Sequence, residues 1–226
     1  MRKLDPKDLS WAVRLLPEEI VALMKRYPRQ IILGGGYLRS TIANEKINDL
    51  DLFTSSPTSA KLFADLLASQ VGRKVHETEN AYSLRLPRGT FIQFIHRWTF
   101  SSPEALLQSF DFTIACAAIW VSGKWVSLAD DNFYSDLAAK RLVYRAPVRN
   151  EDAGGSLLRV LKYYQRGYRI PLDSLGRVLA RTVSGLDTDV GEQDLATEIT
   201  RLLVVVDPQV DPTHEAHLPA EEVEES

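Results

Sequence analysis

The spacing of apolar side chains divides the first third of the chain into helices and strands. Over residues 9–27 apolar positions recur at helical spacing, and Pro17 followed by two glutamates predicts the start of a second helix there. Residues 30–33 are a short apolar run that ends in three glycines, which predicts a strand and a tight turn. The elements predicted after the glycines are a helix over 37–43, a strand over 50–53 and an amphipathic helix over 58–70.

The middle of the chain is rich in strand-forming residues, and the last part is helical. Strands are predicted over 74–77, 82–86 and 90–98, and a helix is predicted to begin at Ser102-Pro103. A small apolar run over 112–121 is followed by a plausible hairpin turn at 122–124. Helical spacing then returns in three segments, 156–167, 174–184 and 192–206. This order predicts an α+β catalytic head over residues 1–150 and a helical neck over 151–206.

The final stretch, residues 207–226, differs in composition from the rest of the chain. It contains no lysine or arginine, seven carboxylates and three prolines. Such a segment has too little apolar surface to offset the entropy of ordering. We therefore expect residues 207–226 to form a disordered acidic tail.

Composition and charge restrict the function classes. The chain has 226 residues, of which 45% are hydrophobic and 25% are charged, as is usual for a globular protein in water. A net charge of −3 argues against a protein that coats nucleic acid non-specifically, although a local basic patch can still bind RNA. The sequence has neither an apolar signal core nor a run long enough to cross a membrane, and its single cysteine, Cys116, permits no internal disulfide. These features predict a cytoplasmic protein with no membrane partner, in which Cys116 is a core residue.

Two aspartates in the predicted strand after the glycines are the first candidate for chemistry. Asp49 and Asp51 are two residues apart, so on a strand they point to the same face, with backbones roughly 6.5–7 Å apart. Two carboxylates in this arrangement can converge on a pair of Mg²⁺ ions held about 3.5–4 Å apart. The alternating Leu50 and Leu52 would face the core and anchor the strand. An isolated Asp-x-Asp pair is more often a solvated turn, so the surrounding sequence decides.

The glycines upstream favour a nucleotide-binding interpretation. Gly35 and Gly36 lie between a predicted strand and a predicted helix, where backbone amides can approach a phosphate without an intervening side chain. Arg39, one turn into the helix, can add a charged fork for a triphosphate. The segment matches neither a P-loop nor a dinucleotide-binding fingerprint, which disfavours an ATPase or a dehydrogenase.

Four motifs in order resemble polymerase β-type nucleotidyltransferases, and most closely the bacterial CCA-adding enzyme and poly(A) polymerase family. The first two are Leu33-Gly-Gly-Gly-Tyr-Leu-Arg39 and Asp49-Leu-Asp-Leu-Phe53. The third, Asp111-Phe-Thr-Ile-Ala-Cys-Ala-Ala118, is similar to an Asp-Phe-Thr-Ile-Asn-Ala motif. The fourth, Leu158-Arg-Val-Leu-Lys162, is similar to the family's Leu-Arg-x-Leu-Arg helix and is preceded by Glu151-Asp152. The resemblance implies a polymerase β-like head, with a mixed sheet and helices, followed by a helical neck.

The resemblance also implies roles for individual residues. Asp49 and Asp51 would hold two Mg²⁺ ions, for which Mn²⁺ can substitute, and Asp111 would assist as a third carboxylate or a ribose contact. The residues expected to bind the nucleotide are Gly35, Gly36, Arg39, Arg159 and Lys162. The chain departs from the family at two points. Ser109-Phe110 stands where the family has a basic pair, and Gln93 stands where relatives often carry an acid.

The expected reaction is Mg²⁺-dependent transfer of a nucleoside monophosphate from an NTP to an acceptor hydroxyl. By analogy with the family, the favoured acceptor is an RNA 3′ end, and the partners are an NTP and that RNA. CCA addition itself is disfavoured, because the chain lacks the neck template motif and the helical body that grips tRNA. Two alternatives remain open. They are nucleotide transfer to a protein or a small molecule, and a regulatory or binding protein that keeps the fold without turnover. The sequence does not indicate an oligomeric state.

Overall fold

The computed structural model describes residues 1–147, 153–184, 186–187 and 189–206. The chain divides into two compact units, Met1–Val148 and Arg149–Ser226. The Glu151-Asp152 pair and the acidic tail expected over 207–226 lie outside the described residues. In the described part, no helix has both the length and the apolar character needed to cross a membrane.

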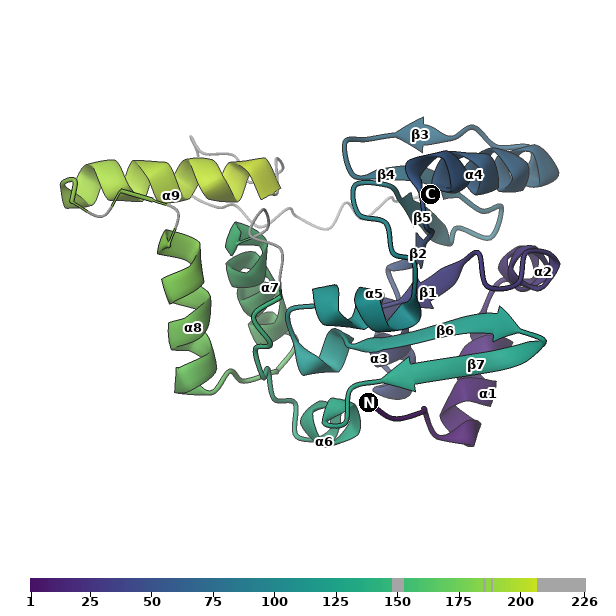
Figure 1. Ribbon diagram of the computed structural model, residues 1–226, viewed down its shortest axis with the longest axis horizontal. Coiled ribbons are helices and arrows are strands. Elements are labelled where there is room, and N and C mark those ends of the chain that lie inside the picture. Colours follow the sequence, from purple (N-terminus) through teal and green to yellow (C-terminus); the bar gives the residue numbers. More distant parts are fainter. Residues whose placement is uncertain (148–152, 185, 188, 207–226) are drawn as a thin grey trace, which may run out of the picture. The chain divides into compact units, whose positions relative to one another are not determined.

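The first unit is built on a seven-stranded sheet with the strand order β3-β4-β5-β2-β1-β6-β7 (Figure 1). Strands β2 and β5 pair in parallel, and the other neighbouring strands pair antiparallel, so the sheet is mixed. The strands are β1 (Ile32–Gly34), β2 (Asp49–Phe53), β3 (His76–Glu77), β4 (Ala81–Arg85), β5 (Phe91–Ile95), β6 (Ala117–Ser122) and β7 (Lys124–Ala129). The predicted α+β head with a mixed sheet is confirmed.

Helices connect these strands and cover both faces of the sheet. They are α1 (Pro6–Leu15), α2 (Glu18–Arg26), α3 (Gly36–Ile42), α4 (Pro57–Val71), α5 (Pro103–Ser109), the 3₁₀ turn η1 (Thr113–Ala115) and α6 (Phe133–Ala138). Serine caps account for two of the predicted helix starts. Ser56 accepts a hydrogen bond from the Ser59 N–H at the start of α4, and Ser102 accepts one from the Ala105 N–H at the start of α5. In both helices proline occupies the first turn, where its missing N–H has no cost.

The two faces of the sheet are covered unequally. On one face Leu50 and Leu52 are fully buried, and α4 packs against β4 and β5. On the other face α5 covers an apolar cluster that includes Ile32, Phe53 and Ala118, with Ile95 at its margin. On the same face, the two candidate aspartates of β2 and their register partners on β5, Phe91 and Gln93, are partly exposed.

Two predicted strands needed correction, and one short helix was not predicted. Strand β5 ends at Ile95, short of the predicted residue 98, because the N–H groups of His96 and Arg97 both donate to the Asn80 carbonyl and turn the chain away. Strand β3 is limited to His76–Glu77. Helix α6 was not predicted, because its six residues are too short for helical spacing to be recognised.

The second unit consists, in its described part, of α7 (Ala153–Gln165), α8 (Leu172–Val183) and α9 (Glu192–Val206). Helix α7 contacts both α8 and α9. Gly154 lets α7 approach α9 closely, because a Cβ there would lie 3.1 Å from Leu202 Cδ2. The three helical segments predicted over 156–167, 174–184 and 192–206 thus correspond to α7, α8 and α9.

Candidate active site

Strand β2 presents the two candidate metal ligands on one face. Asp49 and Asp51 are partly exposed, whereas the alternating Leu50 and Leu52 are buried with at most 1% of their surface exposed. The period of two along a strand explains this separation, since the leucines fix the strand in the core and the carboxylates must then face the other way. The two carboxylates are thus held on a rigid, central strand.

The glycine turn lies directly beside this pair. In the β1–β2 register Gly34 is opposite Asp51, and the N–H of Gly35 donates to the Ala117 carbonyl of β6 at 3.0 Å. Gly35 has a φ of 74°, a conformation that residues with a Cβ rarely adopt. At Gly34 the reason for glycine is space. A Cβ there would lie 3.1 Å from Leu106 Cδ2 and 3.3 Å from Phe110 Cζ.

Phe110 closes this turn from the side of α5. Its ring lies edge-on to Phe53, with centroids 6.1 Å apart, and its edge is the nearest neighbour that a Cβ on Gly35 would meet, at 3.4 Å. This is one of the two positions where the resemblance led us to expect a basic pair. In this chain an apolar ring packs against the glycines in place of a basic side chain.

Arg39 lies beneath the glycine turn and not on its surface. Only 5% of its side chain is exposed, its Nε is 3.4 Å from Glu45 Oε2, and its Nη2 donates to Ser40 Oγ at 2.8 Å. A Cβ on Gly36 would lie 3.8 Å from each terminal guanidinium nitrogen. The guanidinium therefore supports the turn from within, and a triphosphate would have to compete with Glu45 for it. Glu45 was not predictable as a partner, because it reaches Arg39 from an irregular loop. The role of Arg39 in nucleotide binding stays a prediction.

Asp111 is buried beside a second charged group. Its carbonyl accepts the Arg145 N–H at 2.8 Å, and Arg145 Nη1 forms an ion pair with Asp130 Oδ2 at 2.7 Å. Among the described residues no cluster of three or more histidine, cysteine, aspartate or glutamate side chains is arranged to hold a metal ion. The candidate donors on β2 are the pair Asp49 and Asp51, and the role of Asp111 as a third carboxylate stays a prediction.

The neighbouring Cys116 is a core residue, as predicted. Its side chain is fully buried, and its Sγ donates to the Phe112 carbonyl at 3.2 Å. Burial raises the pKa of the Cys116 thiol to about 12. A thiol held in its neutral form is a poor nucleophile, so Cys116 contributes packing and no chemistry to the site.

The two candidate residues from the neck lie on α7 of the second unit. Arg159 is half-buried and Lys162 is exposed. Their neighbours Tyr163 and Tyr164 differ in environment. Tyr163 is buried with its ring 5.7 Å from that of Tyr168, whereas Tyr164 is 56% exposed.

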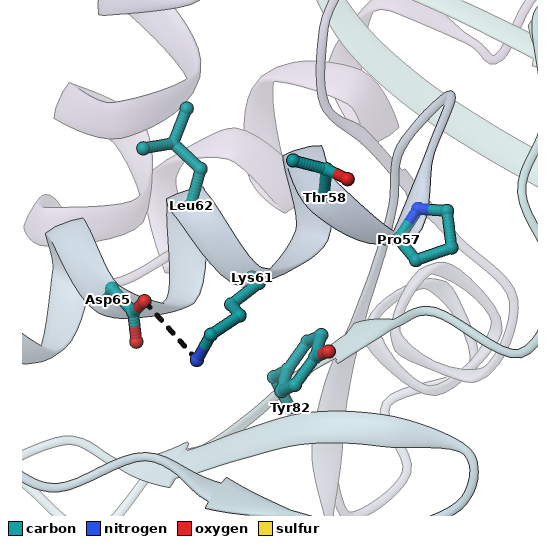
Figure 2. Close-up of a pocket in the computed structure, with 6 residues that line it drawn as sticks. All are labelled: Pro57, Thr58, Lys61, Leu62, Asp65 and Tyr82. Carbon is teal, nitrogen blue, oxygen red and sulfur yellow. Dashed lines mark ion pairs between the residues drawn. The ribbon is translucent and has the colours of Figure 1, made fainter.

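A separate groove lies between α4 and β4 (Figure 2). In it Lys61 Nζ is 3.5 Å from Asp65 Oδ2 and 5.4 Å from the centroid of the Tyr82 ring. Tyr82 alternates along β4 with Ser83, so it lies on the sheet face opposite Asp49 and Asp51. None of the candidate site residues lines this groove, which is therefore distinct from the candidate active site.

Comparison with known proteins gives both a family and a fold. The model of a family described as "Gabija anti-defense 2 family protein" matches residues 7–140. A protein of Bacillus phage SPbetaL7 named "Gabija anti-defense 2" is 28% identical over 164 residues, which make up 73% of this chain and 40% of that protein. This chain thus spans well under two thirds of the length of that relative.

Solved structures of CCA-adding enzymes share the architecture. A Thermotoga maritima CCA-adding enzyme complexed with tRNA has a TM-score of 0.62 at 19% identity, covering 90% of this chain and 51% of that one. A CCA-adding enzyme in complex with CTP has a TM-score of 0.62 at 21% identity, with the same coverage. At these identities the likeness shows the fold alone, which is that of a nucleotidyltransferase head. About half the length of those enzymes has no counterpart in this chain.

Proposed function

Because this chain belongs to the Gabija anti-defense 2 family, we propose that it is an anti-defense protein that works by nucleotidyl transfer. It would move a nucleoside monophosphate from an NTP to an acceptor hydroxyl. The branch expected from the sequence motifs was too specific, since the family is not that of the CCA-adding enzymes, although the superfamily is supported by the fold. The observation that carries the proposal is the placement of Asp49 and Asp51 on one face of β2, with Gly34 directly opposite Asp51.

The two carboxylates fit the metal that the fold family implies. Mg²⁺ prefers oxygen ligands and is commonly held by one or two carboxylates together with substrate phosphates. Asp49 and Asp51 supply such a pair, both are partly exposed, and Mn²⁺ has the same ligand preference. When bound, the metal would neutralise charge on the α-phosphate and on the departing pyrophosphate.

The protein's own residues would position the reactants. The buried leucines of β2 hold both carboxylates in place before substrate arrives, so little reorganisation is needed. Gly35 and Gly36 contribute no side chain of their own to the turn beside Asp51, so their backbone amides could approach a triphosphate. Asp111 would assist as a third carboxylate or as a ribose contact, as the sequence motifs predict. Arg159 and Lys162 remain the candidates for nucleotide contact from α7.

An RNA 3′ end is the acceptor we favour. Solved structures that share the fold include a CCA-adding enzyme with tRNA and a tRNA nucleotidyltransferase with a primer tRNA and an incoming ATP analogue; the latter has a TM-score of 0.54 and 19% identity, covering 78% of this chain and 56% of that one. Transfer to the host's RNA would be one way for an anti-defense protein to act. Transfer to a protein hydroxyl or a small molecule uses the same site chemistry and differs only in where the nucleotide is found.

The test is transfer of α-labelled nucleotide by wild type and by Asp51→Asn. Each NTP is supplied with Mg²⁺ and with total RNA or total protein from the host. We expect label on RNA with wild type, and at least ~100-fold less with Asp51→Asn, because a neutral amide replaces a charged metal ligand. Asp65→Asn removes a carboxylate from the exposed face of α4 and serves as the control that should transfer normally. Equal transfer by wild type and Asp51→Asn would refute the metal-ligand assignment. Label on protein alone would show that the acceptor is a protein and not RNA.

A second candidate is a binding protein that keeps the fold without turnover. Two observations favour it. Phe110 occupies the turn where a basic side chain was expected, and Arg39 is engaged by Glu45. If this candidate is right, wild type transfers no label to any acceptor, and Asp51→Asn counters the host defence as well as wild type does. Loss of anti-defense activity in Asp51→Asn, with an unchanged fold by circular dichroism, would exclude it.

A further inference from the structure

The face of β2 that carries the aspartates continues without interruption onto β5 and β4. In the parallel β2–β5 register Asp49 pairs with Phe91 and Asp51 with Gln93. In the β4–β5 register Phe91 pairs in turn with Arg85, and Gln93 with Ser83. Residues in register on neighbouring strands share a face, with backbones about 4.8 Å apart. A ring and an amide therefore lie beside the two carboxylates, and a guanidinium lies one strand further.

These side chains are accessible. Phe91 and Gln93 are partly exposed, and Arg85 is exposed. The apolar cluster under α5 includes the next pair along the strands, Phe53 and Ile95, and does not include Phe91. An aromatic ring is thus left partly open to solvent immediately beside a candidate catalytic carboxylate.

Arg85 is held over the open ring. Its guanidinium carbon is 5.5 Å from the centroid of the Phe91 ring, and its Nη1 donates to the Gly89 carbonyl at 2.8 Å. One hydrogen bond occupies only one of the five N–H donors of the guanidinium, so the others can face a phosphate. The combination of an aromatic face, a cation and a side-chain amide is suited to an unpaired nucleotide, since it offers stacking, charge neutralisation and hydrogen bonds to a base edge.

Resting on the function proposed above, we infer that Phe91, Arg85 and Gln93 form the subsite for the last unpaired nucleotide of a single-stranded RNA acceptor. The base stacks on Phe91, the phosphate meets Arg85, and the Gln93 amide contacts the base or the sugar. The glycine turn lies on β1, and β5 and β4 lie on the other side of β2. In phosphoryl transfer the attacking and leaving oxygens are roughly in line, so an acceptor belongs on the side of the aspartates away from the triphosphate.

Ser83 of β4 lies next to Gln93 of β5 on the same face of the sheet. Its hydroxyl is buried and has no hydrogen-bond partner in the described part of the chain, although its cross-strand neighbour is Gln93. A buried polar group without a partner has a free-energy cost. A Gln93 amide that turns to meet a nucleotide can also satisfy the Ser83 hydroxyl, so Ser83 is a positioning residue for Gln93.

The test uses the whole protein and a short, fluorescein-labelled single-stranded RNA, with anisotropy measured over a salt series and without NTP. Phe91→Leu removes the ring and should weaken binding by about tenfold, whereas Phe91→Tyr keeps the ring and should bind like wild type. Arg85→Gln should lower the slope of log affinity against log salt by about one, because one phosphate contact is lost. Arg73→Gln makes the same charge change beside the α4 groove, on the opposite face, and should leave both quantities unchanged.

The outcomes separate this inference from the proposed function. In the transfer assay Phe91→Leu should raise the KM for RNA and leave kcat nearly unchanged. Transfer to RNA with an unchanged KM would overturn the subsite and leave the function standing. Wild type that binds RNA through Phe91 and Arg85 but transfers no nucleotide would support the subsite and overturn the function. If Phe91→Leu instead weakens the thermal shift caused by an NTP and not RNA binding, the ring belongs to the incoming nucleotide and the inference is wrong.

Discussion

Arg39 carries a positive charge into the interior of the first unit, where only 5% of its side chain is exposed and Glu45 faces it at 3.4 Å. A cation in this position needs a negative partner, because removing one member of a buried pair leaves an uncompensated charge. The same partner limits what Arg39 can do for a substrate. The structure thus gives a partner within the fold to the charge that the sequence predicts as a phosphate ligand.

Replacing Glu45 by glutamine should separate these two roles. We expect Glu45→Gln to lower the melting temperature of the free protein, since the amide neutralises Arg39 less well. The rise in melting temperature caused by millimolar NTP with Mg²⁺ should become larger than in wild type, because the guanidinium no longer has to leave a carboxylate. Differential scanning fluorimetry measures both quantities, and Glu79→Gln in the exposed β3–β4 loop is the control. A smaller NTP-induced rise in Glu45→Gln would show that Arg39 does not contact the nucleotide.

The buried thiol of Cys116 makes a prediction about alkaline pH. Burial raises the pKa of Cys116 to about 12 from an ordinary value of 9.0, so the folded state favours the neutral thiol. The stability that this provides is complete below pH 9 and is lost as pH rises from about 9 to 12, because the unfolded chain releases the proton first. The free energy of unfolding should therefore fall more steeply with pH in wild type than in Cys116→Ala. Parallel denaturant titrations at pH 8 and at about pH 10.5 test this, and equal slopes would contradict it.

The position of a side chain was predictable from the sequence where it follows from local structure alone. Alternation along a strand was enough to place Asp49 and Asp51 opposite the buried leucines. Arg39 was not predictable in the same way, because its environment depends on Glu45, which sits in an irregular loop with no periodic signal. The sequence marks Gln93 only as a departure from relatives. Its position beside Asp51 was not predictable, because it depends on the register between β2 and β5.

At the scale of elements, the packing of α5 on the glycine turn determines the shape of the site. Gly34 lies under Leu106 and Phe110, so the helix can approach β1 only where no Cβ intervenes. This approach sets where the apolar cover ends and the open face of β2 begins. Amphipathic spacing made α4 predictable and a serine-proline start made α5 predictable. Helix α6 and the end of β5 were not predictable, because short segments are defined by tertiary contacts more than by periodicity.

Gly34→Ala should test this packing. The added Cβ would lie 3.1 Å from Leu106 Cδ2 and 3.3 Å from Phe110 Cζ, so α5 has to shift and the protein should lose about 1–3 kcal/mol of stability. Gly176→Ala in α8 is the matched control. A Cβ at Gly176 meets nothing within 4 Å, and alanine is the better helix former, so this variant should be as stable as wild type or more so. Urea denaturation of both variants gives the comparison, and an unchanged midpoint for Gly34→Ala would show that α5 adjusts at no cost.

At the scale of the whole molecule, the fold class was predictable from the sequence, whereas the family was not. Three of the four motifs that resemble those of CCA-adding enzymes lie in the first unit, and solved structures of those enzymes share the fold. The anti-defense family was not predictable from these motifs. Motifs that hold a metal and a nucleotide carry no information about the acceptor, which is recognised by other surfaces.

The parallel pairing of β2 with β5 has a consequence for synthesis. Strand β2 leaves the ribosome early, but its parallel neighbour follows only after α4, β3 and β4 have been made, and β1 gains its second neighbour only with β6. A nascent chain that has reached α4 therefore carries both aspartates on a strand without one of its final partners. Pairings between distant segments form late in folding. The aspartates can acquire their neighbours Phe91 and Gln93 only once translation has passed β5, which means that a truncated chain ending before Phe91 would display the acidic pair without the surface beside it.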